Sequence, residues 1–503
     1  MVAGNFNIVA NCYSTGSVTT DTGISYYGGL IGYQDGTVTG CYYDSTTSGH
    51  SDEGKGTPKT TEDLMKQETF EGWDFENTWY IAEGSSYPVL RWQLPPPNNG
   101  GGGGSSAADV IDSKGKITAD ATLTSSTGIA ESEIGASTLN MALRRTAEDS
   151  NGIITVNLTI PTVSGASGYG ITLPADSLSS LGENNLLEIN TGVANIILPS
   201  GMLAEDDVEG ARDITLSVQQ ADVSAIEDEE TRSLIGDRPV IQLSLNVDGE
   251  AYAWSNPNAP VTVSIPYTPS EEELADPEHI VIWYIDGEGN VVSVPDGRYD
   301  PETSTVVFST THFSVFAVSY VQKTFADLTG VEWARNAIEV MASKGIINGT
   351  GDDRYSPDAN ITRADYLILL TKTLGLTADF DGNFSDVAEN AYYYNAVGVA
   401  KELGIASGDT DGTFNPTENI SRQDMMALTA RALEKFKGLE PSTDNTVLDR
   451  FDDKGNIADY ALSSMATLVG EGLIAGSGNS LNPLSDTTRA EAAVFLYNIY
   501  NRY

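Results

Sequence analysis

One pattern recurs three times in the last third of the chain, and it restricts the fold more than any other feature. Each copy opens with Phe-x-Asp, continues as a helical run that ends at glycine, passes through a turn and resumes as a second helix. The opening residues are Phe325, Phe384 and Phe451, at intervals of roughly 60 residues. A helix pair of this size cannot bury its apolar face alone. We therefore expect the three units to pack together into one all-α assembly.

The second helix of every unit begins with the same short motif. In the first copy, NITRADYLILL, Thr362 and Asp365 have the spacing of a capping box, in which a hydroxyl and a carboxylate satisfy backbone donors at a helix start. Apolar residues then follow at helical spacing and predict a buried face. We interpret the hydroxyl and the acid as helix-capping scaffold rather than as part of a site.

An arginine stands at the first helical position of all three copies: Arg363, Arg422 and Arg489. A cation there opposes the helix dipole, at a cost of about 0.3–1 kcal/mol when exposed. The chain has 71 acidic and 27 basic residues and a net charge of −44, so a repeated cation is informative. One interpretation is an ion pair with the neighbouring acid or with the Phe-x-Asp aspartate of an adjacent unit. The other is an anion site made by the guanidinium and free helix N–H groups.

The three units, residues 324–380, 381–440 and 448–503, resemble S-layer homology (SLH) domains. The resemblance rests on the Phe-x-Asp opening, the glycine-ended first helix, a G-x-x-x-x-F/Y-x-P turn in the first two units and the arginine motif. It implies a pseudo-threefold assembly whose grooves bind secondary cell-wall polysaccharide, often carrying an acidic pyruvyl ketal. A guanidinium can hold such a carboxylate with two parallel hydrogen bonds.

The resemblance also extends the candidate polysaccharide site beyond the arginines. An aromatic residue follows each Phe-x-Asp aspartate and could stack on sugar rings or fill the interhelical core. A glycine in each turn could let backbone amides approach a ligand, or could simply stop a helix. Trp333 keeps the family residue, whereas the two tyrosines depart from it. The predicted site is Arg363, Arg422, Arg489, Asp327, Asp386, Asp453, Trp333, Tyr392, Tyr460, Gly349, Gly408 and Gly476.

Other function classes find little support in the sequence. An acidic surface repels nucleic acid and anionic membranes, and no apolar run approaches the roughly 18 residues of a membrane helix. His50, His279 and His312 are isolated, and no nucleophile, metalloprotease or phosphate-binding motif is found. Runs of acidic residues predict solvated surface rather than a glycosidase pair. We expect no catalytic residue, no cofactor and no metal.

The N-terminal region, residues 1–94, is rich in Gly, Tyr, Thr and Val. NCYSTGSV at Asn11–Val18 is echoed by TGCYYD at Thr39–Asp44, with a period of about 30 residues or less. This pattern resembles GLUG-type repeats of bacterial surface adhesins and predicts the end of a β-solenoid. Cys12 and Cys41 occupy matching positions and predict a buried stack rather than a functional pair. The N-terminus lacks the pattern of a signal peptide and begins partway through a repeat, which suggests a fragment.

A Pro/Gly/Ser-rich linker is predicted at residues 95–108. From 109 to 320 the chain alternates apolar and polar residues, as in Val240–Val247, and predicts an antiparallel β-sandwich of one or two modules. The predicted fold class is thus multidomain: a β-solenoid fragment, a β-sandwich region and an all-α SLH pseudo-trimer.

The sequence therefore predicts a noncovalent anchor that holds adhesin-like β segments on the cell wall of a Gram-positive-type bacterium. Its expected partner is an acidic, pyruvylated secondary cell-wall polysaccharide. Two alternatives stay open: a lattice-forming S-layer protein that contacts other S-layer subunits, and the anchor part of a larger surface enzyme.

Overall fold

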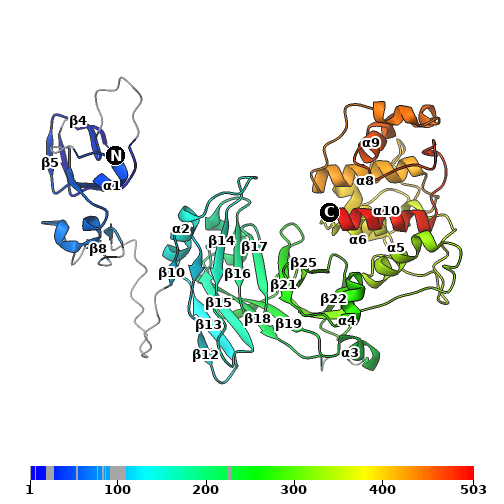
Figure 1. Cartoon of the computed structure of the whole chain (residues 1–503), viewed down its shortest axis with the longest axis horizontal. Coiled ribbons are helices and arrows are strands. Elements are labelled where there is room, and N and C mark those ends of the chain that lie inside the picture. The colour runs from blue at the N-terminus through cyan, green and yellow to red at the C-terminus, as the bar shows by residue number, and fades with distance from the viewer. Residues whose placement is uncertain are drawn as a thin grey trace. The chain divides into compact units, whose positions relative to one another are not determined.

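The computed structural model describes residues 2–5, 7–18, 28–51, 55–75, 78–81, 84, 86–90, 109–223, 226 and 228–503. The predicted linker at 95–108 lies outside these residues. The chain forms two compact units, Met1–Ser105 and Ser106–Tyr503. Their elements are labelled in Figure 1.

The N-terminal unit is built from short strands that pair in parallel. Its first three strands pair in turn with the next three, and every pair joins residues 29 positions apart, which agrees with the predicted period. A further strand then extends the last of these pairs in parallel. The strands are β1 (Val2–Asn5) with β4 (Ile31–Gln34), β2 (Ile8–Ala10) with β5 (Thr37–Thr39), and β3 (Tyr13–Ser14) with β6 (Tyr42–Asp44), followed by β7 (Thr57–Lys59). The short α1 (Ser45–Ser48), β8 (Trp79–Tyr80) and β9 (Val89–Leu90) complete the unit.

Cys12 and Cys41 stand 29 residues apart, at the same position of successive layers. Both thiols are free, and Cys41 is buried beside Leu30 and Tyr43, whereas Cys12 is exposed. The prediction of a buried stack was therefore wrong for Cys12. The thiol of Cys41 donates to the carbonyls of neighbouring strand residues, so it packs as a small polar-tipped core group. The described part of the chain thus contains no disulfide.

The second unit begins with a β module, residues 109–320, made of two open sheets. Within the described residues, one sheet has eight strands in the order β10 (Val110–Ile111), β11 (Ile117–Thr118), β14 (Thr155–Thr159), β16 (Leu186–Asn190), β17 (Asn195–Pro199), β21 (Val261–Pro266), β25 (Thr305–Thr310) and β24 (Arg298–Asp300). The other has the order β12 (Thr122–Thr124), β13 (Ile129–Glu133), β15 (Gly168–Pro174), β18 (Asp213–Gln220), β19 (Val240–Val247), β26 (Val315–Tyr320), β22 (Ile280–Ile285) and β23 (Val291–Val294), with β20 (Glu250–Tyr252) paired to β19. Three helices flank them: α2 (Ala136–Arg145), α3 (Glu229–Ile235) and α4 (Glu271–Ala275).

The prediction of a purely antiparallel sandwich was wrong in one respect. The β11–β14, β13–β15 and β14–β16 pairs are parallel, because the chain crosses between the two sheets at this end. The two sheets share one continuous apolar core that runs from Ile117 to Val318. Alternation of buried and half-buried residues along β14, β18 and β19 is the pattern that the sequence predicted.

The helical region, residues 324–503, consists of three helix pairs. The first helix of each pair packs on the second helix of the preceding pair: α7 on α6, α9 on α8 and α5 on α10. The three pairs therefore close into a ring, and their apolar residues form one shared core. The helices are α5 (Glu332–Ser343), α6 (Arg363–Leu374), α7 (Tyr394–Glu402), α8 (Arg422–Phe436), α9 (Asp459–Gly470) and α10 (Arg489–Arg502).

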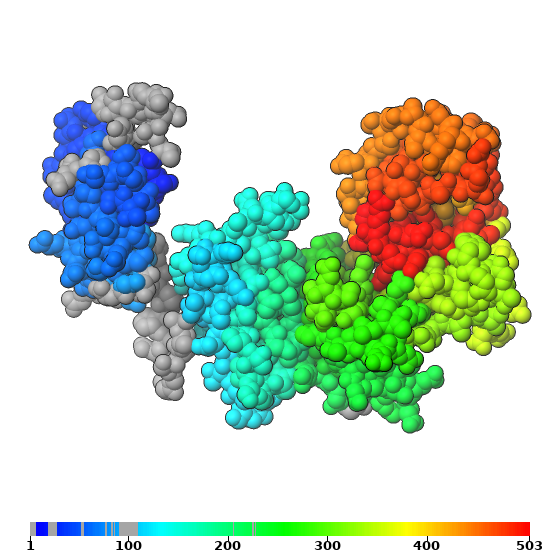
Figure 2. Space-filling view, in the orientation of Figure 1, coloured from blue at the N-terminus to red at the C-terminus, as the bar shows by residue number. Residues whose placement is uncertain are grey.

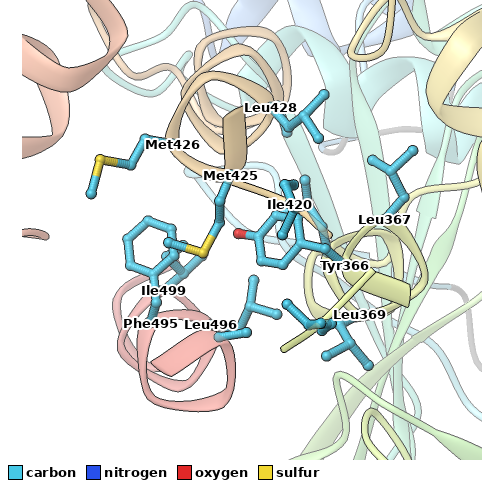
Figure 3. Packing of buried hydrophobic residues seen from close by; sticks show 14 of the residues in the cluster. Tyr366, Leu367, Leu369, Ile420, Met425, Met426, Leu428, Phe495, Leu496 and Ile499 are labelled. Atoms are coloured by element: carbon cyan, nitrogen blue, oxygen red, sulfur yellow. The ribbon is translucent and has the colours of Figure 1, made fainter. Parts of the chain in front are cut away.

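The centre of the ring is a cycle of three backbone hydrogen bonds just before α6, α8 and α10. The amide of Ile361 donates to Thr487, that of Thr487 to Ile420 and that of Ile420 to Ile361, at 2.9, 3.0 and 3.0 Å. All three residues are fully or almost fully buried. In the shared core, Tyr366, Met425 and Leu496 extend toward one another from α6, α8 and α10 (Figure 3). The cycle fixes the threefold arrangement.

Thr487 breaks the chemical symmetry of this cycle. Its two counterparts are isoleucines, and its buried hydroxyl oxygen has no hydrogen-bond partner among the described residues. A buried polar group without a partner lowers stability. Thr429, by contrast, is equally buried, but its hydroxyl bonds the Met425 carbonyl at 2.8 Å and the Tyr366 hydroxyl at 2.6 Å.

We expect Thr487→Val to raise the free energy of unfolding of the helical region by about 1 kcal/mol, because it removes an unpaired hydroxyl at constant shape. Thr429→Val, the matched control, should lower it by about 1–2 kcal/mol, since it strands the Tyr366 hydroxyl. Urea denaturation followed by circular dichroism at 222 nm measures both. Equal destabilisation by the two substitutions would contradict the assignment of an unpaired hydroxyl at Thr487.

Candidate functional site

Arg363 starts α6 but extends across to the second helix pair. Its Nε donates to the Phe414 carbonyl at 3.0 Å, and its guanidinium lies over the Phe414 ring, 4.9 Å from the ring centre. Nη1 lies 3.3 Å from the carboxylate of Asp424. Among the described residues, Nη2 has no hydrogen-bond partner. The side chain is thus held in place with part of its donor edge unused.

The other two arginines repeat this arrangement around the ring. Nε of Arg422 donates to the Leu481 carbonyl at 3.0 Å, and its Nη1 bonds Glu491 at 3.1 Å. Nε of Arg489 donates to the Tyr355 carbonyl at 2.9 Å, while Nη2 donates to a further backbone carbonyl at 2.8 Å. Within the described part of the chain, no carboxylate lies within ion-pair distance of Arg489. The partners of the first two are the motif acids of the next unit, not the Phe-x-Asp aspartates.

The complete capping box predicted for each motif forms only at Thr488 and Glu491. In the first two units the hydroxyl caps the helix, but the side chain of the acid does not bond the N-cap amide. The acids instead bond groups of other units, which the sequence interpretation missed. One oxygen of Asp424 accepts from the Ser421 hydroxyl at 2.8 Å, and the other accepts from the Tyr460 hydroxyl at 2.6 Å. Asp365 is held in the same way by its own capping threonine and by the Tyr392 hydroxyl at 2.8 Å. Burial and the hydrogen bond to Asp365 raise the pKa of Tyr392 to about 12. The sequence could not show this role, because the tyrosine that bonds the second carboxylate oxygen of Asp365 or Asp424 comes from another unit and reaches it only when the units pack together.

The three aromatic residues lie on the surface with their rings accessible. Trp333, Tyr392 and Tyr460 are 60%, 74% and 53% exposed, so none fills the interhelical core. Trp333 is the counterpart of the two tyrosines, because α5 packs on α10 as α7 packs on α6. At Arg363 the arginine comes from the first unit, the acid Asp424 from the second and the aromatic residue Tyr460 from the third. The ring repeats this order of units at the other two arginines, although no carboxylate of the described residues pairs with Arg489.

Free helix N–H groups, the second half of the anion-site hypothesis, are not found. The amides of Arg363 and Ala364 donate to the carbonyls of Glu418 and Pro416 at 2.9 and 3.0 Å, and the next amide, that of Asp365, donates to the Thr362 hydroxyl. The other two helices are closed off in the same way by the turn of the following unit. The hypothesis was wrong here because packing between units consumes the donors that an isolated helix would leave open.

The Phe-x-Asp aspartates lie in the turns of their own units. The two carboxylate oxygens of Asp327 accept from the amides of Tyr355 and Ser356 at 2.9 and 2.8 Å. Asp386 and Asp453 do the same in the second and third turns. Burial opposes ionisation of the Asp327 carboxyl, but the two amide hydrogen bonds outweigh it and lower its pKa. These three carboxylates fix the turns against which the arginines lie.

The turn glycines are required by close packing. A Cβ atom on Gly408 would lie 2.6 Å from the Phe384 ring, and one on Gly349 or Gly476 would lie 2.8 or 2.7 Å from the equivalent opening phenylalanine. The absence of a side chain therefore lets each opening ring pack under its turn. Gly408 also lines the groove described next.

A cavity of about 480 Å³ lies at the arginine of the first unit. This Arg363 groove is bounded by Arg363, Asp424 and Tyr460, one from each unit, and by Arg431 of α8. Nη1 of Arg431 donates to the Ile405 carbonyl at 3.2 Å, which holds a second cation in the groove. Sequence inspection missed Arg431, whose only signal was its place two helical turns after the motif. Asp409, Glu418, Asn415 and Asn419 also line the cavity.

Nothing in the described residues resembles a metal centre: no group of three or more His, Cys, Asp or Glu side chains could hold an ion. His279 is buried, with Nδ1 2.8 Å from the Ser343 hydroxyl, and His312 packs against Tyr284. No described helix is both long and apolar enough to span a membrane.

The S-layer homology domain family matches residues 324–367, 383–426 and 450–493. The chain therefore carries three SLH domains at its C-terminal end, and their presence implies attachment at the cell wall. The surface-layer 125 kDa protein of Lysinibacillus sphaericus is 31% identical over 166 residues, 32% of this chain and 14% of that protein. Exoglucanase XynX of Acetivibrio thermocellus is 33% identical over 181 residues, 36% of this chain and 16% of that protein.

An amylopullulanase of Thermoanaerobacterium thermosulfurigenes is 26% identical over 368 residues, 70% of this chain. The helical region alone is much shorter than this stretch, so the similarity must extend well into the β module. The chain spans about a fifth or less of the length of these relatives: 20% of the amylopullulanase and less of the other two.

We expect Asp327→Asn to lower the free energy of unfolding by about 1–2 kcal/mol at neutral pH, because an amide offers one acceptor for two backbone donors. The Asp327 carboxylate stabilises the folded state fully at pH values above the pKa that it has in the unfolded chain, ordinarily 3.8. Its pKa in the folded state is lower, and the stabilisation is lost as the pH falls through that value. The difference from wild type should therefore shrink below about pH 4. Urea titrations between pH 3 and 7 measure it, with the exposed Asp358→Asn in the same turn as control. A pH-independent difference would contradict the role of the charge.

Proposed function

We propose that the three grooves bind an acidic secondary cell-wall polysaccharide and so hold the chain noncovalently on the bacterial wall. The observation that carries this proposal is how the guanidinium groups of Arg363, Arg422 and Arg489 are hydrogen-bonded. Each guanidinium is fixed by a carbonyl of the next unit, and each keeps a terminal nitrogen without a partner among the described residues. A preorganised guanidinium loses less conformational freedom when a carboxylate binds.

The charge of the chain makes such local cations necessary. At a net charge of −44, the average surface repels an acidic glycan. In the Arg363 groove, Arg363 and Arg431 supply two cations to the lining. A pyruvyl ketal offers one carboxylate per substituted sugar, which matches the single unused edge of each motif arginine.

The remaining groove groups suit a sugar ring rather than a simple anion. The exposed rings of Trp333, Tyr392 and Tyr460 offer flat apolar faces. Asp424 and its neighbours Asp409 and Glu418 offer acceptors for sugar hydroxyl groups. We place the Phe-x-Asp aspartates and Gly349, Gly408 and Gly476 in a supporting role, since they shape the turns that hold the arginines.

The N-terminal unit would then be displayed on the surface of a Gram-positive-type cell. Its parallel strands, stacked at a constant offset of 29 residues, support our proposal of a β-solenoid end with GLUG-type, adhesin-like repeats. Parallel stacking of identical positions, such as Cys12 over Cys41, is what such a coil requires.

A second candidate is the anchor part of a larger surface enzyme. The amylopullulanase and exoglucanase similarities favour it, because the chain spans a fifth or less of each. The surface-layer similarity favours the third, a lattice-forming protein that contacts other S-layer subunits. The sequence of the complete gene would show whether a catalytic domain belongs to the same protein. Assembly of the purified chain into ordered sheets without wall material would support the lattice-forming protein.

We expect the triple variant Arg363→Ala, Arg422→Ala and Arg489→Ala to weaken binding to purified wall polysaccharide by on the order of 100-fold, because it removes the charge-assisted hydrogen bonds. Removing the ketal carboxylates from the glycan should weaken wild-type binding to a similar extent. Isothermal titration calorimetry on the whole chain measures both.

The matched control removes the same charge elsewhere, by changing Arg212, Arg450 and Arg502 to alanine, and should bind like wild type. Circular dichroism checks that both triple variants remain folded. Unchanged affinity in the groove variant, or equal affinity for glycan with and without ketal, would refute the proposed role of the arginines.

We expect Trp333→Ala to weaken glycan binding by about fivefold to tenfold, since an aromatic face contributes on the order of 1 kcal/mol. Its 60% exposure means that folding should be unaffected. Phe436→Ala, which removes a 41% exposed ring elsewhere on the helical region, is the control. Equal affinities of the two variants would assign Trp333 no contact with the glycan.

A further inference from the structure

The end of α5 carries a buried lysine that reaches into the β module. Lys344 is 1% exposed, and its Nζ donates to the carbonyls of Ile280 and Gly297 at 2.6 and 2.7 Å. Burial and the nearby positive charge of Arg298 lower the pKa of Lys344 to about 7. A lysine is almost never buried this completely without a carboxylate partner. Here the β module covers it and supplies both acceptors.

A second contact centre is Glu278, which lies directly before β22. Its carboxylate accepts from the Tyr497 hydroxyl at 2.8 and 2.9 Å. Asn336 of α5 and Asn501 of α10 lie at 3.4 Å from the same carboxylate. One side chain of the β module therefore gathers donors from two helices of different units.

Further contacts extend this seam, by which we mean the surface shared by the β module and the helical region. Arg298 lies over the Tyr500 ring, 4.7 Å from its centre. The Thr377 hydroxyl donates to the Pro257 carbonyl at 3.0 Å. A Cβ atom on Gly345 would lie 2.6 Å from the Cβ of Ser293, so the two backbones approach closely here. In Figure 2 the green surface of the later β strands and the red surface of α10 meet along this line.

The seam leaves the grooves open. On α6 and α10 the seam residues lie in the C-terminal halves, at Thr371–Thr377 and Tyr497–Tyr503, whereas the arginines occupy the first helical positions. On α5 the seam contact Asn336 lies one turn after Trp333, whose side chain nevertheless stays 60% exposed. Thr371, the first of these α6 residues, lies eight positions after Arg363, which corresponds to about 12 Å along the helix. The β module can therefore stay docked while a glycan occupies the grooves.

We infer that the β module is part of the wall anchor itself: it docks on the helical region through Lys344 and Glu278 and forms one rigid body with it. The β module thus supports the helical region through a fixed interface, and it is not a separate domain joined to that region by a flexible linker. The amylopullulanase similarity supports this independently, because it continues from the helical region into the β module. If the β module and the helical region act as one anchor, we expect them to occur together in proteins that carry different outer domains.

The test cuts the whole chain at the connection between the two parts. A specific protease site is inserted after Gln322, and the cut chain is examined by sedimentation velocity. The two pieces should remain one species in the wild type. Glu278→Lys should raise their dissociation constant at least tenfold, because it places a cation beside Lys344 and Arg298 and removes the acceptor of Tyr497. Ser293→Trp should have the same effect by a steric route.

Glu271→Lys is the matched control, since it makes the same charge change at an exposed position of α4 and should leave the cut pieces associated. Glycan affinity of the uncut Glu278→Lys chain should equal that of the wild type, which separates this result from the role of the grooves. Separation of the wild-type pieces on cutting, or equal behaviour of the variants at Glu278 and Glu271, would overturn the inference.

Discussion

The cycle of backbone hydrogen bonds between Ile361, Ile420 and Thr487 is the constraint on which the helical region depends. It brings the starts of α6, α8 and α10 to one buried point, and it does so with main-chain groups, so the hydrogen bonds themselves do not depend on which side chain stands at each position. Because the starts are fixed, the first amides of each helix meet the turn of the next unit. The same geometry places each arginine against that turn. The same packing that closes the ring therefore also positions the arginines of the candidate site.

Much of this architecture is predictable from repetition. The helix pairs, the capping threonines and the shared core follow from periodic apolar residues and from the Thr362–Asp365 spacing, and the structure confirms them. The sheets of the β module follow from alternation, as in β19, whose bounds match the predicted strand. Their parallel pairs could not be predicted, because alternation tells which face of a strand is buried but not which strand lies beside it.

The site was less predictable, for a reason of the same kind. The arginines were found because three copies could be compared. The roles of Asp424 and Arg431 depend on which unit follows which around the ring, and local spacing carries no information about that order. The aspartates of Phe-x-Asp show a different limit: repetition marks them as important, and the structure adds that each bonds two backbone amides of its turn, as Asp327 does those of Tyr355 and Ser356. The repetition of a residue in all three units does not by itself tell whether that residue supports the fold or contacts a ligand.

The Arg363 groove takes its arginine, acid and aromatic residue from three different units, and the ring repeats this order of units at the other two arginines. This division has a consequence for how such a chain can change. Deleting one unit would remove one component from every groove, so two units would retain no complete groove rather than two thirds of the binding capacity. Adding a fourth unit would meet a closed ring with no free partner. Copy number is therefore set by geometry to three, and selection can alter the grooves one at a time only by substitution within the ring.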